Sequence, residues 1–341
     1  MEQPRQNLKE SGMSRIINVE PSDEIDILDY FKDQFNEQTK DKLEKEHPQE
    51  LDDAVPVINN FMKDFLKQYG IEAVNIPVKN IYLIDWSKLT EEQTQILKKK
   101  AQETAALYNS AKQAIVMLLN YEDDKKLVFF QTLVHEMFHV NSFISYTRFN
   151  NQEGGYDIKL TERVKNDEKK TILLKQRRIG FSVCQPDGVA YFNNLNEAVT
   201  TELTIRFDWK YFSQLPQVAE EYKRRQDFLE EEIQTSGKKL DLDQTKRKLA
   251  NTEEKQQADG SWIFTVNPYP YSDERKNLYK LIDDLFEKNE SEFSSKEEIF
   301  NLFAMAAMTG KLLPIAKLIE KTYGKGSFRN LGEKTAKKDG D

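Results

Sequence analysis

One short segment constrains this chain more than any other feature: residues 133–140, which read L-V-H-E-M-F-H-V. Its two histidines, His135 and His139, are four residues apart, and residues at that spacing on an α-helix lie one turn apart on the same face. The apolar side chains around them continue from Leu127 to Ile144 with helical periodicity, which predicts a long and mostly buried helix. On such a helix both imidazole rings can reach the same ion.

The segment has the form His-Glu-x-x-His, because Glu136 directly follows the first histidine. Imidazole nitrogens bind zinc at about 2.0–2.1 Å, and a glutamate beside such an ion can accept a proton from water. The chain contains 3 histidines in 341 residues, so chance is a poor explanation for two of them at this spacing around a glutamate. Buried histidines beside a buried glutamate also need a polar partner, which a metal ion provides. The sequence therefore predicts one bound Zn²⁺.

A catalytic zinc ion needs a third protein ligand and an open coordination position. The remaining histidine, His47, lies far upstream in a polar segment, so we expect a carboxylate. Glu197 is the first candidate, because it lies at the start of a second predicted helix, 195–212, which Asn194 or Asn196 can cap. Three other carboxylates stay open as alternatives: Glu202, which lies about 140° around that helix from Glu197, then Glu153 and Asp157.

Two supporting roles belong to the same region. Thr201, one turn after Glu197, shares its face of the helix and is expected to hydrogen-bond a ligand histidine. A hydrolase also needs a group that stabilises negative charge on the substrate oxygen. That role stays unassigned among four side chains, of which the last lies in a loop stiffened by prolines: Tyr191, Arg206, Tyr269 and Tyr271.

The rest of the chain predicts an α+β fold. A small mixed sheet packs on the motif helix, and a β-hairpin, the helix with the glutamate and a mostly helical C-terminal part follow. Apolar periodicity, a capping box at Thr90–Gln93 and an Asp-Gly turn support these elements. The expected helices cover 51–70, 90–104, 195–212 and two or three segments of 271–323 that are broken at Gly310. The expected strands lie in 75–86, 114–120, 177–183 and 189–192.

We divide the chain into a polar, partly flexible N-terminal segment, 1–50, a metal-binding domain, 51–331, and a disordered tail, 332–341. Within the domain, residues 216–259 are rich in Glu, Lys, Arg and Gln and contain few apolar side chains. This composition is typical of a pair of exposed helices or of a charged arm.

Composition excludes several classes of function. The net charge of −8 repels a phosphate backbone, so we expect no nucleic acid partner. The longest apolar run, 114–119, is far short of the roughly 20 residues that cross a bilayer, and residues 1–25 lack the apolar core of a secretory signal. The single cysteine, Cys184, allows no intrachain disulfide and suits a reducing compartment. We therefore expect a soluble cytoplasmic protein without a membrane partner, in which Cys184 is buried or half-buried rather than a nucleophile.

The motif His135-Glu-Met-Phe-His139, followed downstream by Asn196-Glu197-Ala, resembles that of the zincin metallopeptidases, in particular the gluzincins, whose third zinc ligand is a glutamate. The resemblance covers roughly residues 75–212. It implies a zincin-like fold in which a small sheet precedes the motif helix, and 115–119 is placed like the edge strand that holds extended substrate. It further implies a zinc-dependent peptidase with a peptide or protein substrate and with these site residues: ligands His135, His139 and Glu197, and general base Glu136.

Two other interpretations stay open. A zinc-containing protein whose role is partner binding would close its metal site with four protein ligands and use segment 216–259 as its contact surface. Alternatively, the protein is an enzyme that acts on one partner protein, and the charged segment selects that partner. Structural zinc sites favour cysteine, and Cys184 is not near the motif, so the sequence favours the hydrolase.

Overall fold

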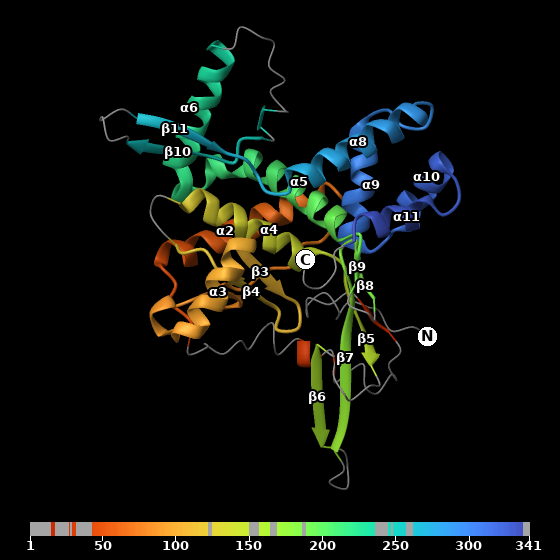
Figure 1. The fold of residues 1–341 in the computed structure, drawn as a ribbon, viewed down its shortest axis with the longest axis horizontal. Coiled ribbons are helices and arrows are strands. Elements are labelled where there is room, and N and C mark those ends of the chain that lie inside the picture. The colour runs from red at the N-terminus through yellow and green to blue at the C-terminus, as the bar shows by residue number, and fades with distance from the viewer. Residues whose placement is uncertain are drawn as a thin grey trace.

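The computed structural model describes residues 15–17, 27, 29–31, 43–121, 125–149, 157–163, 169–185, 189–235, 245–246, 248–256 and 262–336. Most of the predicted flexible segment 1–50, and residues 337–341 of the predicted tail, lie outside these ranges. Within them the chain is a mixed α+β protein with three small sheets and a mostly helical C-terminal part, as the sequence predicts (Figure 1). None of the helices in these ranges combines the length and the apolar character that a membrane span requires.

The first elements of the main core are helix α2, Gln49–Lys67, and a three-stranded sheet. The sheet has the order β2-β4-β3, where β2 (Ile81–Leu83) is parallel and β3 (Ala106–Asn109) antiparallel to the central strand β4 (Ala114–Met117). The expectation that 115–119 forms the edge strand is therefore wrong. A tight turn folds β3 back along β4, so β3 takes the outer edge, at a place where the sequence pattern predicts no strand.

Helix α3, Glu91–Glu103, begins at the capping box that the sequence predicts. Thr90 Oγ1 accepts a hydrogen bond from the backbone N–H of Gln93 over 3.2 Å, and Gln93 Oε1 accepts one from the N–H of Thr90 over 3.0 Å. These bonds give partners to two N–H groups near the start of the helix. Single 3₁₀ turns, η3 (Val78–Asn80) and η4 (Trp86–Lys88), flank β2.

Helix α4, Lys126–Asn141, carries the motif and lies near the centre of the protein (Figure 1). It ends three residues before the apolar periodicity predicts, because Ser142 has extended backbone and Ile144 already belongs to the next strand. The helix is buried over most of its surface and packs against α5, Asn193–Tyr211.

An aromatic cluster joins α2, α4 and α5. Phe138 of α4 contacts Phe65 of α2 and Phe207 of α5, with ring centroids 5.6 Å and 6.0 Å apart respectively. All three rings are buried, and full burial of one such side chain stabilises a fold by about 1.5–3 kcal/mol. This cluster fixes the two helices that carry the predicted metal ligands relative to each other.

The largest sheet has six strands, and its β6–β7 hairpin extends away from the helical body (Figure 1). The order is β1-β5-β7-β8-β9, with β6 paired to β7. The predicted hairpin is confirmed as β8 paired antiparallel with β9, but segment 177–183 is not a single strand. It divides at Gly180, which has a φ of +55°. The bounds are β1 Arg15–Ile17, β5 Ile144–Phe149, β6 Ile158–Arg163, β7 Lys169–Ile179, β8 Ser182–Cys184 and β9 Ala190–Tyr191.

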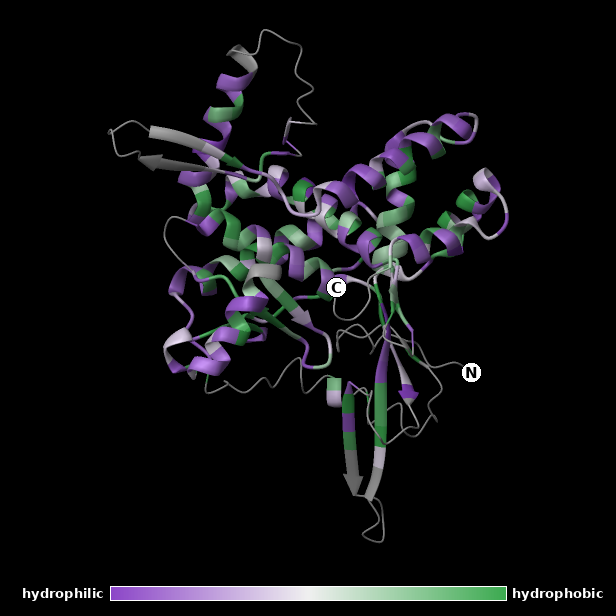
Figure 2. Ribbon diagram, viewed as in Figure 1, coloured by the Kyte–Doolittle hydropathy of each residue, from purple (hydrophilic) through white to green (hydrophobic). Residues whose placement is uncertain are grey.

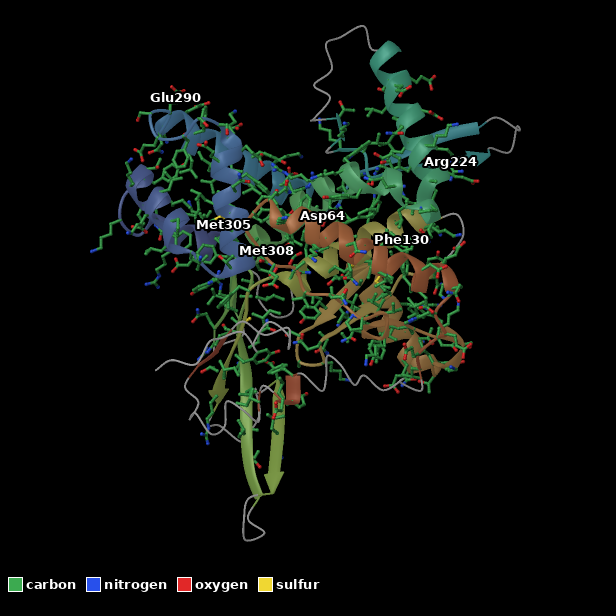
Figure 3. All side chains as sticks on the ribbon, turned by 180° about the vertical axis from the view of Figure 1, so that it is seen from behind. Asp64, Phe130, Arg224, Glu290, Met305 and Met308 are labelled. Atoms are coloured by element: carbon green, nitrogen blue, oxygen red, sulfur yellow. The ribbon has the colours of Figure 1, made fainter. Side chains whose placement is uncertain are left out.

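Helices α8 to α11 form the C-terminal part, and Gly310 ends α9 in the left-handed conformation, φ +76°, at the predicted break. Figure 2 shows α9 as mainly hydrophobic, and Figure 3 labels Met305 and the buried Met308 on it. The predicted disorder does not begin at 332, because α11 continues to Lys334 and Gly332 is buried against Phe192. The bounds are α8 Ser272–Lys288, α9 Lys296–Thr309, α10 Leu313–Tyr323 and α11 Ser327–Lys334.

The charged segment 216–259 is only partly the predicted pair of helices. After the 3₁₀ turns η5 (Phe212–Gln214) and η6 (Pro216–Val218) comes helix α6, Ala219–Thr235, but residues 251–256 form a strand. This strand, β10 (Asn251–Gln256), pairs antiparallel with β11 (Trp262–Asn267) and packs against α6 (Figure 1).

Candidate metal centre

Helices α4 and α5 bring together the three side chains that the sequence predicts as metal ligands. The Nε2 atoms of His135 and His139 are 3.1 Å apart. Glu197 Oε2 lies 3.3 Å from the first of them and 3.4 Å from the second. Three ligands about 2.0–2.1 Å from an ion in tetrahedral geometry lie about 3.3 Å from one another. The triangle therefore has the dimensions of three corners of a zinc site, and these residues fit the ion.

The charges around the triangle also favour a cation. Burial opposes protonation of His139, but the carboxylates of Glu197 and Glu136 outweigh it and raise the pKa of His139 to about 9. Burial would raise the pKa of Glu197, whereas the two histidines stabilise its charged form and lower that pKa. His139 Nδ1 is buried without a hydrogen-bond partner among the described residues. Two carboxylates thus face a cluster of nitrogen ligands, which is a suitable environment for a divalent ion.

Glu136 lies beside the triangle rather than in it. Its side chain is only 7% exposed. Burial raises the pKa of its carboxyl group, although the histidines and a hydrogen bond from the backbone N–H of Tyr108 act in the opposite direction. Tyr108 belongs to the edge strand β3, so the edge of the sheet meets α4 at this carboxylate. A buried carboxyl group with a raised pKa can accept and return a proton.

The start of α5, which carries the third candidate ligand, is fixed by distant backbone groups rather than by a side chain. The residue at its N-cap is Phe192, so neither Asn194 nor Asn196 caps the helix as the sequence suggests. Instead the N–H groups of Phe192 and Asn194 donate to the carbonyl oxygens of Gly332 and Thr335, over 3.1 Å and 3.0 Å. Helix α11 thereby gives partners to N–H groups that would otherwise lack them.

The turn between β7 and β8 packs against the residue before Glu197. Asn196 Oδ1 accepts a hydrogen bond from the backbone N–H of Phe181 over 2.8 Å. A Cβ atom at Gly180 would lie 2.1 Å from the same oxygen, so only glycine fits at this position. The six-stranded sheet therefore holds the glutamate-bearing turn of α5 in place.

The competing carboxylates lie elsewhere. Glu202 is buried on another face of α5, where it accepts a 2.8 Å hydrogen bond from Arg206. Asp157 is exposed beside the six-stranded sheet, and Glu153 lies outside the described residues. The predicted hydrogen bond between Thr201 and a ligand histidine is not formed, because the buried Thr201 hydroxyl has no partner among the described residues.

Two residues that the sequence excludes from the centre lie away from it. His47 forms a 2.7 Å hydrogen bond with the carbonyl oxygen of Ile81, in the first sheet. Cys184 is half-buried in β8, as expected.

The sequence leaves four candidates for the group that stabilises the substrate oxygen. Of these, Tyr271 contacts the triangle. Its ring stacks on that of His135, with centroids 6.1 Å apart and planes inclined by 16°. Burial and the carboxylates of Glu197 and Glu136 raise the pKa of Tyr271, which keeps its hydroxyl protonated at neutral pH. The backbone of Tyr271 is left-handed, with a φ of +55°, directly before α8.

A cavity of about 550 Å³ lies beside the triangle. Helices α4 and α5 line it on one side, and residues 104–106, at the start of the edge strand β3, line another. The base of the β10–β11 hairpin and the loop 268–271 complete the lining. His135 and Glu136 reach this cavity from α4, so the metal centre has access to a space large enough for several side chains of a ligand.

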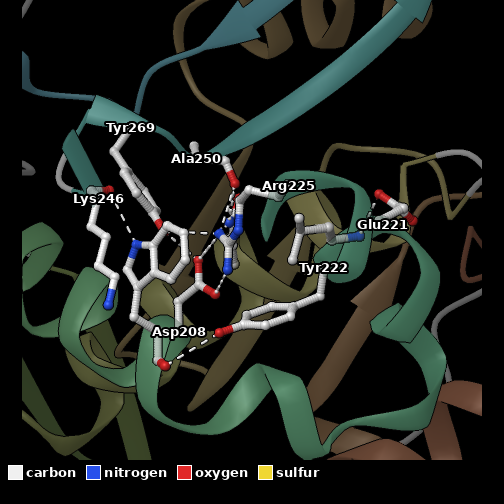
Figure 4. Close-up of polar contacts among 10 residues, drawn as sticks. Asp208, Glu221, Tyr222, Arg225, Lys246, Ala250 and Tyr269 are labelled. Carbon is white, nitrogen blue, oxygen red and sulfur yellow. Dashed lines mark hydrogen bonds and ion pairs between the residues drawn. The ribbon is translucent and has the colours of Figure 1, made fainter. Parts of the chain in front are cut away.

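A buried ion pair fixes the loop that carries Tyr271 (Figure 4). Arg225 of α6 donates to both carboxylate oxygens of Asp208 in α5, each over 2.7 Å, and neither side chain is exposed. The Tyr269 hydroxyl donates to the same carboxylate, and Arg225 also donates to the carbonyl oxygen of Ala250 over 2.8 Å. This network joins α5, α6, the hairpin and the loop.

The network also reaches the motif helix. Gln131, one turn before His135 on α4, donates to Asp208 over 2.6 Å and to the carbonyl oxygen of Ala250 over 2.8 Å. The Arg225 guanidinium also stacks on Trp209, with its Cζ atom 4.0 Å from the centroid of the ring. From the sequence, α6 is predicted to be an exposed, charged helix. The burial of Arg225 could not be predicted, because it depends on the contact with Asp208 of α5.

Comparison with protein-family models, curated proteins and solved structures yielded no match. Any function assigned to the centre must therefore come from the geometry and chemistry of its residues.

Proposed function

We propose that this protein is a zinc-dependent peptidase of the zincin type, in which His135, His139 and Glu197 bind one Zn²⁺ and Glu136 is the general base. The observation that carries the proposal is the triangle of two Nε2 atoms and one Oε2 atom with edges of 3.1–3.4 Å. Its dimensions match three corners of a tetrahedral zinc site.

The position of Glu136 supports hydrolysis rather than simple metal storage. Bound at the triangle, zinc would polarise a substrate carbonyl and lower the pKa of water. The Glu136 carboxylate is buried beside the triangle and faces the cavity, where it can take a proton from water and deliver it to the leaving amine. The Tyr271 hydroxyl, which stays protonated at neutral pH, can donate a hydrogen bond to the substrate oxygen.

The edge strand supports a peptide as the substrate. Among the described strands β3 pairs with β4 alone, and the residues at its start line the cavity. The outer side of such a strand offers backbone N–H and C=O groups to an extended peptide, which can add as a further strand. A peptide held there passes the carboxylate of Glu136, since the N–H of Tyr108 in β3 is bonded to it.

A zinc-containing protein that only binds a partner fits the centre less well. Such a site has four protein ligands, whereas the described residues bring together one group of three, His135, His139 and Glu197. The absorption spectrum of the cobalt-substituted protein separates the two proposals, because an open position binds added azide and changes the spectrum.

The test combines metal content with hydrolysis of a mixed peptide library. Wild-type protein is expected to bind about one zinc per chain, and His135→Ala to lose it. Glu136→Gln keeps the metal and the fold but loses about 10²–10⁴-fold in hydrolysis. Glu290→Gln, at an exposed position on the α8 side (Figure 3), is the matched control and retains full activity. Wild-type hydrolysis by Glu136→Gln would contradict the role of Glu136.

A further inference from the structure

The cavity beside the metal centre has an uncharged lining. Apart from His135 and Glu136, which belong to the centre, the described residues that line it carry no ionisable acid or base other than tyrosine. A charged ligand group would lose its hydration there without gaining an opposite charge, which is costly. The cavity therefore selects against acidic and basic side chains.

Two polar atoms in this lining are buried and lack partners. Thr201, 1% exposed, and Asn251, 6% exposed, both line the cavity. Neither Thr201 Oγ1 nor Asn251 Oδ1 has a hydrogen-bond partner among the described residues. Buried polar atoms in native proteins are nearly always hydrogen-bonded, so two residues of one cavity lining that carry such atoms point to a ligand that supplies the bonds.

Gln131 adds a third acceptor to the same place. Its NH₂ group donates to Asp208 and to the carbonyl oxygen of Ala250, the residue next to Asn251. Because both partners are acceptors, they fix the orientation of the amide and leave Oε1 as its remaining polar atom. The Arg225–Asp208 ion pair lies directly behind it and is completely buried, which holds the acceptor rigidly.

Two of these three groups lie one helical turn from the metal ligands, one on each helix. Thr201 follows Glu197 by four residues on α5, and Gln131 precedes His135 by four residues on α4. Four residues correspond to about 6 Å along a helix, whereas an extended peptide advances about 3.3 Å per residue. The acceptors are therefore within reach of a side chain adjacent to a bond held at the metal centre.

We infer that Gln131, Thr201 and Asn251 form a carboxamide subsite, which binds a glutamine or asparagine side chain next to the bond that is cut. This inference rests on the proposed peptidase function and defines its substrate class. The ligand NH₂ group donates to Asn251 Oδ1 and Gln131 Oε1, and the Thr201 hydroxyl donates to the ligand carbonyl oxygen. Asn251 Oδ1, Gln131 Oε1 and the Thr201 hydroxyl then each have a partner.

The same arrangement rejects close relatives of glutamine. Glutamate has the same shape but places acceptors and a negative charge against the acceptors of the subsite. Methionine fills the space but leaves buried oxygens unpaired. Lysine supplies donors but brings a charge that nothing in the lining balances. Each substitution is expected to lower kcat/KM by about 10- to 100-fold, because lost bonds to buried polar groups are costly.

Cleavage profiling with a randomised peptide library tests the subsite. Mass spectrometry of products from the zinc-loaded protein should show glutamine and asparagine enriched at one position beside the cleaved bond. Thr201→Val and Asn251→Leu keep the shape of the lining but remove the Thr201 donor and the Asn251 acceptor, so they should shift that position towards leucine and methionine. Thr200→Val is the matched control, since Thr200 is equally buried with an unpartnered hydroxyl on the same helix but does not line the cavity.

A second measurement separates the subsite from the reaction. The Glu136→Gln protein is incubated with the same library, and the peptides that remain bound are sequenced. If wild-type protein cleaves nothing but this variant retains carboxamide peptides, the peptidase proposal fails and the subsite stands. If wild-type protein cleaves without preference, or prefers glutamate, lysine or apolar residues, the subsite is refuted and the peptidase stands. A preference that Thr201→Val and Asn251→Leu leave unchanged also refutes it.

Discussion

The ring of Tyr271 stacks on the ring of His135, with planes only 16° apart, although the two residues come from α4 and from a loop more than a hundred residues later. Tyr271 makes this contact from a left-handed backbone, φ +55°, which a residue with a Cβ adopts at some cost in energy. The surrounding structure offsets this cost, because the Arg225–Asp208 pair anchors Tyr269, two residues earlier. The loop thus presents the Tyr271 hydroxyl to the metal centre.

The first prediction concerns that hydroxyl. Tyr271→Phe keeps the stacked ring and removes only the donor, so zinc content should stay at the wild-type level. Loss of one donor to the substrate oxygen typically lowers kcat by about 10²–10³-fold. Steady-state kinetics should show the loss in kcat more than in KM. Tyr191→Phe, in β9, is the control, and an unchanged kcat in Tyr271→Phe would exclude the role.

The second prediction concerns the buried ion pair. Asp208→Asn leaves the Arg225 guanidinium buried without its anion, and removing one partner of a buried pair typically costs about 3–5 kcal/mol. Urea unfolding should reveal this loss in the free energy of unfolding. Asp273→Asn breaks the exposed pair with Lys276 and should leave stability unchanged. Equal stability of the two variants would show that the network does not anchor the loop.

The third prediction concerns the turn that holds the start of α5. Gly180→Ala combines left-handed strain with a Cβ that would lie 2.1 Å from Asn196 Oδ1, next to Glu197. We expect lower stability and weaker zinc binding, measured by competition with a chromophoric chelator. Gly70→Ala has the same left-handed strain, φ +68°, but no atom within 4 Å of the new Cβ. Gly70→Ala should therefore lower stability but leave zinc affinity unchanged. Equal zinc affinities in the two variants would show that the Gly180 turn does not support the position of Glu197.

The fourth prediction concerns pH. In the metal-free protein the pKa of His139 is about 9, so this histidine carries a proton at neutral pH that an incoming metal ion must displace. Zinc affinity should therefore increase about tenfold per pH unit for each proton displaced, and the contribution of His139 should end near pH 9. Chelator competition at pH 6, 7 and 8 measures the slope. Affinity that does not change over this range would mean that no ligand is protonated.

The parts of the centre that the sequence predicts are those that depend on local spacing. His135 and His139 need only one helix, and Glu197 follows from the shortage of other ligands once a second helix is recognised. The capping box at Thr90 and the helix end at Gly310 are local in the same sense. In these places a few neighbouring residues determine the backbone conformation.

The parts that the sequence does not predict depend on partners far along the chain. β10, with the sequence N-T-E-E-K-Q, lacks the alternation of a strand and is one only because the apolar β11 pairs with it. Arg225 resembles any exposed arginine of a charged helix until Asp208 faces it. Thr201 lines the cavity beside the centre, but its buried hydroxyl has no partner among the described residues and so does not reach a ligand histidine.

The backbone bonds between the start of α5 and residues 332–335 have a consequence for biogenesis. During synthesis the motif helix emerges from the ribosome long before α11 does, so the glutamate turn lacks its N-terminal partners for most of that time. We therefore expect full affinity for a metal ion only after α11 has docked against the start of α5. A chain that lacks residues 332–335 is therefore expected to hold Glu197 less firmly and to bind a metal ion more weakly than the full chain.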